Sequence, residues 1–164
     1  MLHPHTKNFG VWIHWCGGKM DCPLCKSAMI VLEIEQVACD ELSRVEVDHC
    51  TACGGIWLDA GELELLFGDA HQGRILIGSF EQVKFSKERP RPCPICLKKM
   101  HKVLVSPRDE PVIIDRCPKG HGLWFDKGEL PQVLSKASFD REQKIIKLLS
   151  EMFGRNKSEV KNGS

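Results

Sequence analysis

Alternation of apolar and charged positions predicts two β-hairpins in this chain. Residues Met29–Ile34 form an apolar run, and Arg44–Asp48 alternate β-branched with charged side chains, so both are expected to be strands. Val103–Val105 and Val112–Asp115 repeat this plan across a shorter turn. A further strand is expected over Gly10–Trp15. The pattern thus predicts the same hairpin twice.

A helical period appears near the end of the chain. Between Ser138 and Phe153 apolar residues recur at i, i+3, i+4, i+7 and i+8, and Gly154 supplies a stop. The stripe consists of Ile145, Leu148, Leu149, Met152 and Phe153. It either folds back on the protein or offers anchors to a partner or to a second copy of the chain. We expect an amphipathic helix over 138–154 and a disordered tail over 155–164.

A nine-residue segment occurs twice, as Gly55–Leu63 and again as Gly122–Leu130, at a constant offset of 67. Both copies read Gly-x-Trp-x-Asp-x-Gly-Glu-Leu, and chance does not align nine residues in this way. The Asp with a Glu three residues later predicts the capped start of a helix. Pro131 conflicts with a long second helix, which is therefore expected to start later or to be short and kinked.

The cysteines explain what stabilises the repeat. Seven of the nine, with one histidine, form pairs of metal-ligand turns before each nine-residue segment. A Cys-x-x-Cys turn directs two sulfurs inward, and two such turns complete a tetrahedral zinc shell. The predicted ligands of two structural Zn²⁺ ions are Cys22, Cys25, Cys50 and Cys53, and Cys93, Cys96, Cys117 and His121. His101 competes with His121 for the second shell, but its place on the hairpin makes it the weaker choice.

Other readings of these side chains are less favoured. Redox chemistry at a Cys-x-x-Cys pair would need a βαβ context, which the pattern does not show. Trp57 and Trp124 are expected in the core beside the metal sites, and not as exposed anchors. Capping accounts for Asp59, Glu62, Asp126 and Glu129, which leaves little reason to assign them catalysis. His3, His5, His14 and Cys16 could form a third, weak metal site, although surface imidazoles are the simpler reading, and Cys39 is a bystander.

With these motifs in place, the chain resembles the bacterial transcription factor IIB-type zinc ribbon family in duplicate. The resemblance rests on Cys-Pro-x-Cys, a hairpin, and Cys-x-x-Cys-Gly-Gly-Ile-Trp-Leu-Asp-x-Gly-Glu-Leu, over about 20–67 and 91–135. The second copy departs from it at His121 and at Pro131. The resemblance implies a zinc-binding module named for a ribbon that docks on RNA polymerase.

Size points to the same class of protein. Modules this short bury too little apolar surface to fold without metal, disulfides or association. The expected fold is a small metal-stabilised α+β protein of two tandem zinc ribbons, each a hairpin with a short helix, plus the C-terminal helix. The expected segments are a leader (1–19), ribbon 1 (20–68), a linker (69–90), ribbon 2 (91–135) and the C-terminal helix with its tail. Membrane-spanning and signal segments are not expected, and the cysteine use favours a reducing cytoplasm.

Charge is divided unevenly along the chain. Residues 1–83 carry 5 Lys and Arg against 12 Asp and Glu, and residues 84–164 carry 18 against 10, so the halves are −7 and +8. A basic segment in the second half consists of Lys84, Lys87, Arg89, Arg91, Lys98, Lys99 and Lys102. It either tracks a nucleic-acid backbone or is a solvated face.

These observations favour a non-enzymatic zinc-binding adaptor that docks on a protein assembly, with a link to transcription. Nucleic-acid binding through the basic second half is the alternative. Four protein donors are expected to close each shell, which leaves no position for a substrate, so enzymatic chemistry is not expected. Self-association through the C-terminal helix is a further expectation.

Overall fold

The computed structural model describes residues 11–14, 20–38, 41–66, 70–105 and 110–136. Below, the first repeat means residues 20–68 and the second repeat means 91–135. Across the described residues the elements are β1 (Val11–His14), β2 (Ile30–Ala38), β3 (Glu41–His49), β4 (Ile56–Asp59), α1 (Glu62–Leu66), α2 (Ala70–Gly78), β5 (Glu81–Gln82), β6 (His101–Val105), β7 (Val112–Arg116), β8 (Gly122–Phe125) and α3 (Glu129–Lys136). The four hairpin strands are therefore confirmed, with longer bounds than the pattern gave, and the N-terminal strand is confirmed over the shorter range Val11–His14.

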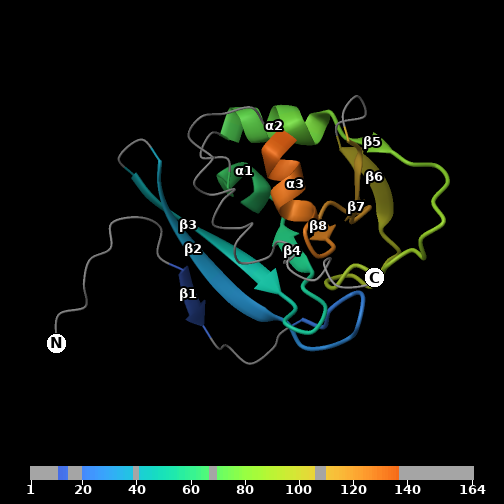
Figure 1. Ribbon diagram of the computed structural model, residues 1–164, viewed down its shortest axis with the longest axis horizontal. Coiled ribbons are helices and arrows are strands. Elements are labelled where there is room, and N and C mark those ends of the chain that lie inside the picture. Colours follow the sequence, from blue (N-terminus) through green and yellow to red (C-terminus); the bar gives the residue numbers. More distant parts are fainter. Residues whose placement is uncertain (1–10, 15–19, 39–40, 67–69, 106–109, 137–164) are drawn as a thin grey trace, which may run out of the picture.

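The two repeats share one antiparallel sheet. Its strand order is β1-β2-β3-β4-β8-β7-β6-β5, so each repeat supplies three adjacent strands, and β4 pairs with β8 across the middle. Among the described residues, the short strands β1 and β5 form the two outer edges. The helices α1, α2 and α3 gather on one side of the structure, beside β4 and β8 (Figure 1). The ribbons are thus halves of one body.

The junction between the repeats is centred on two tryptophans. Trp57 lies opposite Trp124 in the register of β4 and β8, and the two are the same residue of the repeat. A carbon added to Gly55 would lie 2.1 Å from Cζ2 of Trp124, and one added to Gly122 would lie 2.7 Å from Cζ2 of Trp57. Each indole therefore packs against a glycine of the other repeat, as a local two-fold relation requires.

Alternation along β4 and β8 separates two buried clusters. Ile56, Leu58, Leu123 and Phe125 belong to a large cluster that includes residues of both hairpins and of helices α1 and α3. Trp57 and Trp124 point the other way, because successive side chains on a strand face opposite sides. They join a cluster that contains cysteines of both repeats. Both tryptophans are fully buried, which confirms the core prediction.

The helices begin later than the capping pattern predicted. Gly61 and Gly128 have φ values of +94° and +84°, which helical residues do not adopt, and α1 and α3 start at the glutamates that follow. The Leu65 amide donates to the Gly61 carbonyl (3.2 Å). The N-cap residue of α1 is therefore Gly61 and not Asp59. Pro131 is then the third residue of α3, in a turn whose N–H groups have no intrahelical partner.

The segment expected as a linker (69–90) carries α2 and β5, and β5 pairs with β6. The expected C-terminal helix and its stripe Ile145, Leu148, Leu149, Met152 and Phe153 lie outside the described residues, as do His3, His5, Cys16 and Cys39. A search of the described helices finds none with the length and apolarity needed to cross a bilayer.

Candidate metal centres

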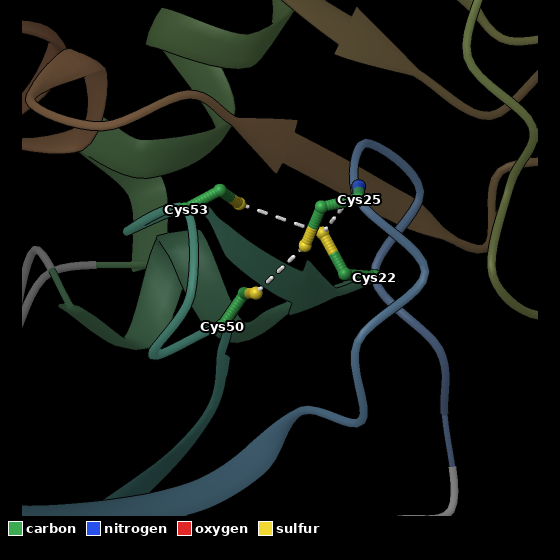
Figure 2. Close-up of side chains that lie close together, drawn as sticks. All are labelled: Cys22, Cys25, Cys50 and Cys53. Atoms are coloured by element: carbon green, nitrogen blue, oxygen red, sulfur yellow. Dashed lines mark hydrogen bonds between the residues drawn. The ribbon is translucent and has the colours of Figure 1, made fainter.

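The first centre is formed by two turns of the first repeat. Cys22 and Cys25 come from the turn before β2, and Cys50 and Cys53 come from the turn between β3 and β4. Figure 2 shows the four side chains directed toward one another, with sulfur–sulfur distances of 3.5 Å for Cys22 and Cys53 and 3.4 Å for Cys25 and Cys50. The Leu24 and Cys25 amides point at the Cys22 sulfur from 3.4 Å. Such N–H contacts stabilise a thiolate.

The second centre has the same plan with one imidazole. Sγ of Cys96 lies 3.7 Å from Sγ of Cys117, and Nδ1 of His121 lies 3.5 Å from Sγ of Cys117 and 3.9 Å from Sγ of Cys93. In the turn between Cys117 and His121, Gly120 has a left-handed backbone conformation (φ +75°). The structure thus brings His121 into the cluster, whereas His101 is exposed on β6.

The geometry of both clusters fits two structural zinc sites. Within each cluster the four ligand atoms lie within 4.8 Å of one another. Tetrahedral Zn²⁺ with Zn–S bonds of about 2.3 Å places sulfurs about 3.7 Å apart, whereas a disulfide would bring them to about 2.05 Å. The seven cysteines of the clusters are free thiols. The described cysteines therefore form metal-binding sets and not bridges.

When no cation is present, the thiols of each cluster differ: hydrogen bonds, chiefly to Ser27, lower the pKa of Cys25 to about 6, whereas burial opposes ionisation of Cys22 and Cys93. Burial raises the pKa of Cys93 to about 11, and it also raises the pKa of Cys22. Zinc binding must therefore release protons, and the affinity of the sites falls as the pH falls. Because each set consists of four protein donors, a bound ion has no open position for a substrate, as is usual for structural zinc.

The repeated carboxylates support the turn that follows each tryptophan. Oε2 of Glu62 accepts from the Asp59 amide (2.6 Å), and the Glu129 carboxylate does the same for Asp126 (2.7 Å). The Asp59 carboxylate accepts from the Trp57 indole N–H at 2.7 Å. Half of the predicted capping box, the glutamate half, is therefore present, while the aspartates bind the indoles.

The pH dependence of stability should carry the signature of Glu62. Burial, together with the charges of Asp59, Asp48 and Glu46, raises the pKa of Glu62 to about 8 from its ordinary value of 4.5. A carboxyl with a raised folded-state pKa contributes stability that is complete below its unfolded pKa and is lost as the pH rises through the folded pKa. Glu62→Gln keeps an acceptor for the Asp59 amide and cannot ionise.

We therefore expect Glu62→Gln to gain stability relative to the unmodified protein as the pH rises from about 6.5 to about 9. Urea unfolding of the zinc-loaded proteins at both pH values measures this difference. A constant difference across the range would show that Glu62 does not titrate there. Glu81→Gln, at an exposed position of β5, is the control and should show no such trend.

The structure divides the predicted basic segment. Nζ of Lys102 is buried and lies 2.9 Å from the Asp115 carboxylate and 2.5 Å from that of Glu88. Burial acts to lower the pKa of Lys102, but these two contacts outweigh it and raise that pKa. Arg91 is mostly buried and pairs with Asp126 and, at 3.8 Å, with Asp115. The members that remain exposed are Lys84, Lys87, Arg89, Lys98 and Lys99.

Sequence reasoning missed these internal ion pairs and the glycine contacts at the junction. Asp48 and Asp115 stand two residues before Cys50 and Cys117 at the same offset of 67, a signal that the repeat extends upstream of the metal turns. Gly55 and Gly122 also recur at this offset.

The family comparison agrees with this geometry. The family described as a transcription factor zinc-finger, the TFIIB-type zinc ribbon, matches residues 21–67 and again 92–136, together more than half of the chain. A search of curated proteins and a search of solved structures each found no match. The chain therefore belongs to the TFIIB-type zinc ribbon family and carries two copies of its module.

Proposed function

We propose that this zinc-binding protein is a non-enzymatic adaptor that docks on a protein assembly, and that the assembly is related to transcription. In this proposal the eight cluster residues are structural ligands: Cys22, Cys25, Cys50, Cys53, Cys93, Cys96, Cys117 and His121. The observation that carries it is the closed donor set of each cluster. A catalytic zinc site keeps a position for water or substrate, whereas four protein donors fill the tetrahedron.

The repeated carboxylates give the same indication. Glu62 and Glu129 accept hydrogen bonds from backbone amides, and Asp59 and Asp126 accept them from indoles. Side chains held in this way support the turn and the tryptophan. The proposal places the protein in the reducing cytoplasm, where thiolate ligands persist.

The metal turns offer a surface for docking. Leu24 and Ile95 occupy the same position of the two Cys-Pro-x-Cys turns, and these residues are 46% and 47% exposed. Apolar side chains exposed at matching places in both repeats are suited to contact with a protein.

Affinity capture from an extract of the source cells tests this function. We expect a protein assembly on the unmodified bait and its loss from Leu24→Glu/Ile95→Glu, because a buried charge at the contact is costly. The control is Ile75→Glu on α2, at a residue that is 55% exposed, and every bait must retain two Zn²⁺. Equal recovery on all baits would argue against docking through the turns.

Nuclease treatment of the same samples distinguishes nucleic-acid binding, the alternative function, from docking on a protein. Exposed Lys84, Lys87, Arg89, Lys98 and Lys99 still allow contact with a phosphate backbone, although Arg91 and Lys102 are engaged internally. If the captured material disappears after nuclease treatment, binding runs through nucleic acid and the adaptor proposal fails.

A further inference from the structure

The second repeat carries its own counterions. Asp126 accepts from the Trp124 indole, Asp115 lies opposite Trp124 in the register of β7 and β8, and both carboxylates contact the guanidinium of Arg91. Asp115 also binds Lys102 at 2.9 Å. Two cations of the same repeat thus neutralise two partly or fully buried carboxylates.

Backbone hydrogen bonds and strand register identify the residues of the first repeat that correspond to Arg91 and Lys102. The Met100 amide donates to the Arg91 carbonyl (2.8 Å), and the Met29 amide donates to the Met20 carbonyl (3.0 Å), so Met20 stands where Arg91 stands. Lys102 lies opposite Asp115 in the register of β6 and β7. Val31 lies opposite Asp48 in the register of β2 and β3, so Val31 stands where Lys102 stands.

The carboxylates, by contrast, are present in both repeats. Asp48 lies opposite Trp57 as Asp115 lies opposite Trp124. Asp59 accepts from the Trp57 indole as Asp126 accepts from the Trp124 indole. Asp48 is only 9% exposed, and no ion pair recorded among the described residues includes Asp48 or Asp59. The first repeat thus keeps the acidic site and lacks its cations.

We propose that Asp48 and Asp59 bind an arginine side chain from a basic segment of the docking partner. The inference rests on the proposed adaptor function and names the chemistry of its contact. The second repeat supplies the precedent, because a guanidinium there contacts the matching pair of carboxylates. A planar, charged group with several donors suits two carboxylates better than an ammonium does.

Two observations favour a cationic side chain of a protein as the occupant. Within the described residues, the groups of three or more His, Cys, Asp or Glu side chains that could hold a metal ion are the two cysteine-containing clusters. Asp48 and Asp59 do not belong to either group, so they are not arranged as a metal site. The half of the chain that contains the site has a net charge of −7. This charge would attract a basic segment and repel an acidic one.

Met20→Arg tests whether the site accepts a guanidinium. The new side chain starts from the place of Arg91 and should reach Asp59 and Asp48, raising Tm by about 2 to 4 °C, as expected for a favourable partly buried pair. Met20→Leu should leave Tm near its starting value, and adding Asp59→Asn should remove the gain. A Tm that is unchanged or lower in Met20→Arg would overturn the assignment.

Peptide binding tests the site directly. The probes are a short labelled peptide with a pair of arginines and the same peptide with neutral citrullines, and fluorescence anisotropy gives the affinities. We expect the arginine peptide to bind at least about tenfold more tightly, and Met20→Arg and Asp59→Asn each to remove most of this preference. Glu81→Gln changes the net charge by the same amount as Met20→Arg and should keep the preference. Equal affinity for the two peptides, or equal loss in Glu81→Gln, would overturn the proposal.

The outcomes separate this inference from the adaptor function. A partner captured equally by the unmodified protein and by Met20→Arg would leave the docking function in place and reject this site. Arginine binding that depends on Asp59, with no protein captured from the extract, would support the site and reject the docking function. Self-association abolished by Met20→Arg, measured by sedimentation, would show that the occupant is a second copy of the chain.

Discussion

Replacing Cys50 with serine should unfold both repeats, although it removes a ligand from only one. Structural zinc contributes about 10 to 16 kcal/mol in small metal-dependent domains, which equals or exceeds the usual stability of a whole domain, about 5 to 15 kcal/mol. The large buried cluster includes Val45 and Leu58 of the first repeat with Ile114 and Phe125 of the second, so one half cannot lose its core alone. We expect less than one Zn²⁺ per chain, and far-ultraviolet circular dichroism typical of an unfolded chain.

Metal analysis and circular dichroism of the unmodified protein, before and after a strong chelator, complete this test. Thr51→Ser, an exposed change in the same turn, is the matched control and should keep two Zn²⁺ per chain and the native spectrum. A Cys50→Ser protein with one Zn²⁺ and about half of the secondary structure would show that the repeats fold independently. Unchanged circular dichroism after complete zinc removal would contradict the metal-dependent fold itself.

Adding a single methyl group at the junction should be nearly as damaging. A Cβ atom on Gly122 would lie 2.2 Å from the backbone oxygen of Leu58 and 2.7 Å from the Trp57 ring. Neither group can move freely, because Leu58 and Trp57 are fully buried and β4 is held in the sheet. We expect Gly122→Ala to lower the free energy of unfolding by about 3 kcal/mol or more. Urea unfolding of the zinc-loaded protein measures the loss.

Gly55→Ala should have a similar effect, because its added carbon would lie 2.1 Å from the Trp124 ring. The matched control is Gly78→Ala at the end of α2, where the added carbon would meet no atom within 4 Å beyond its chain neighbours and the backbone of its own helix. This change should alter the free energy of unfolding by no more than about 1 kcal/mol. Equal unfolding midpoints for Gly122→Ala and Gly78→Ala would show that the β4–β8 contact does not limit stability.

The local features of the molecule could be predicted from its sequence, because each depends on residues close together in the chain. Ligand spacing indicated both clusters, including His121, whose imidazole is long enough to make up for its one-residue offset. Alternation located the strands of both hairpins. The buried positions of Trp57 and Trp124 followed from their size and from the neighbouring metal turns.

Features that depend on contacts between the repeats could not be predicted in this way. The pairing of β4 with β8 joins segments 67 residues apart, and a period along one strand says nothing about its neighbour across the junction. The sequence does not show which residues of the basic segment are exposed. Hydropathy does not reveal that the Lys102 side chain is buried and pairs with Asp115. The Asp-x-x-Glu pattern predicts a start of the first helix that is too early, because the intervening glycine is left-handed. The second helix starts later and is short, as Pro131 indicated.

The order of strands also affects how readily copies of the protein associate in a concentrated solution. Within the part of the chain that the structure describes, the repeats join through β4 and β8, and the edges of the sheet are β1, with four residues, and β5, with two. Both residues of β5, Glu81 and Gln82, are exposed. An edge so short, and polar on the β5 side, is a poor template for adding strands from another chain. The arrangement should therefore protect a β-rich, cysteine-rich protein from stacking into aggregates at high concentration.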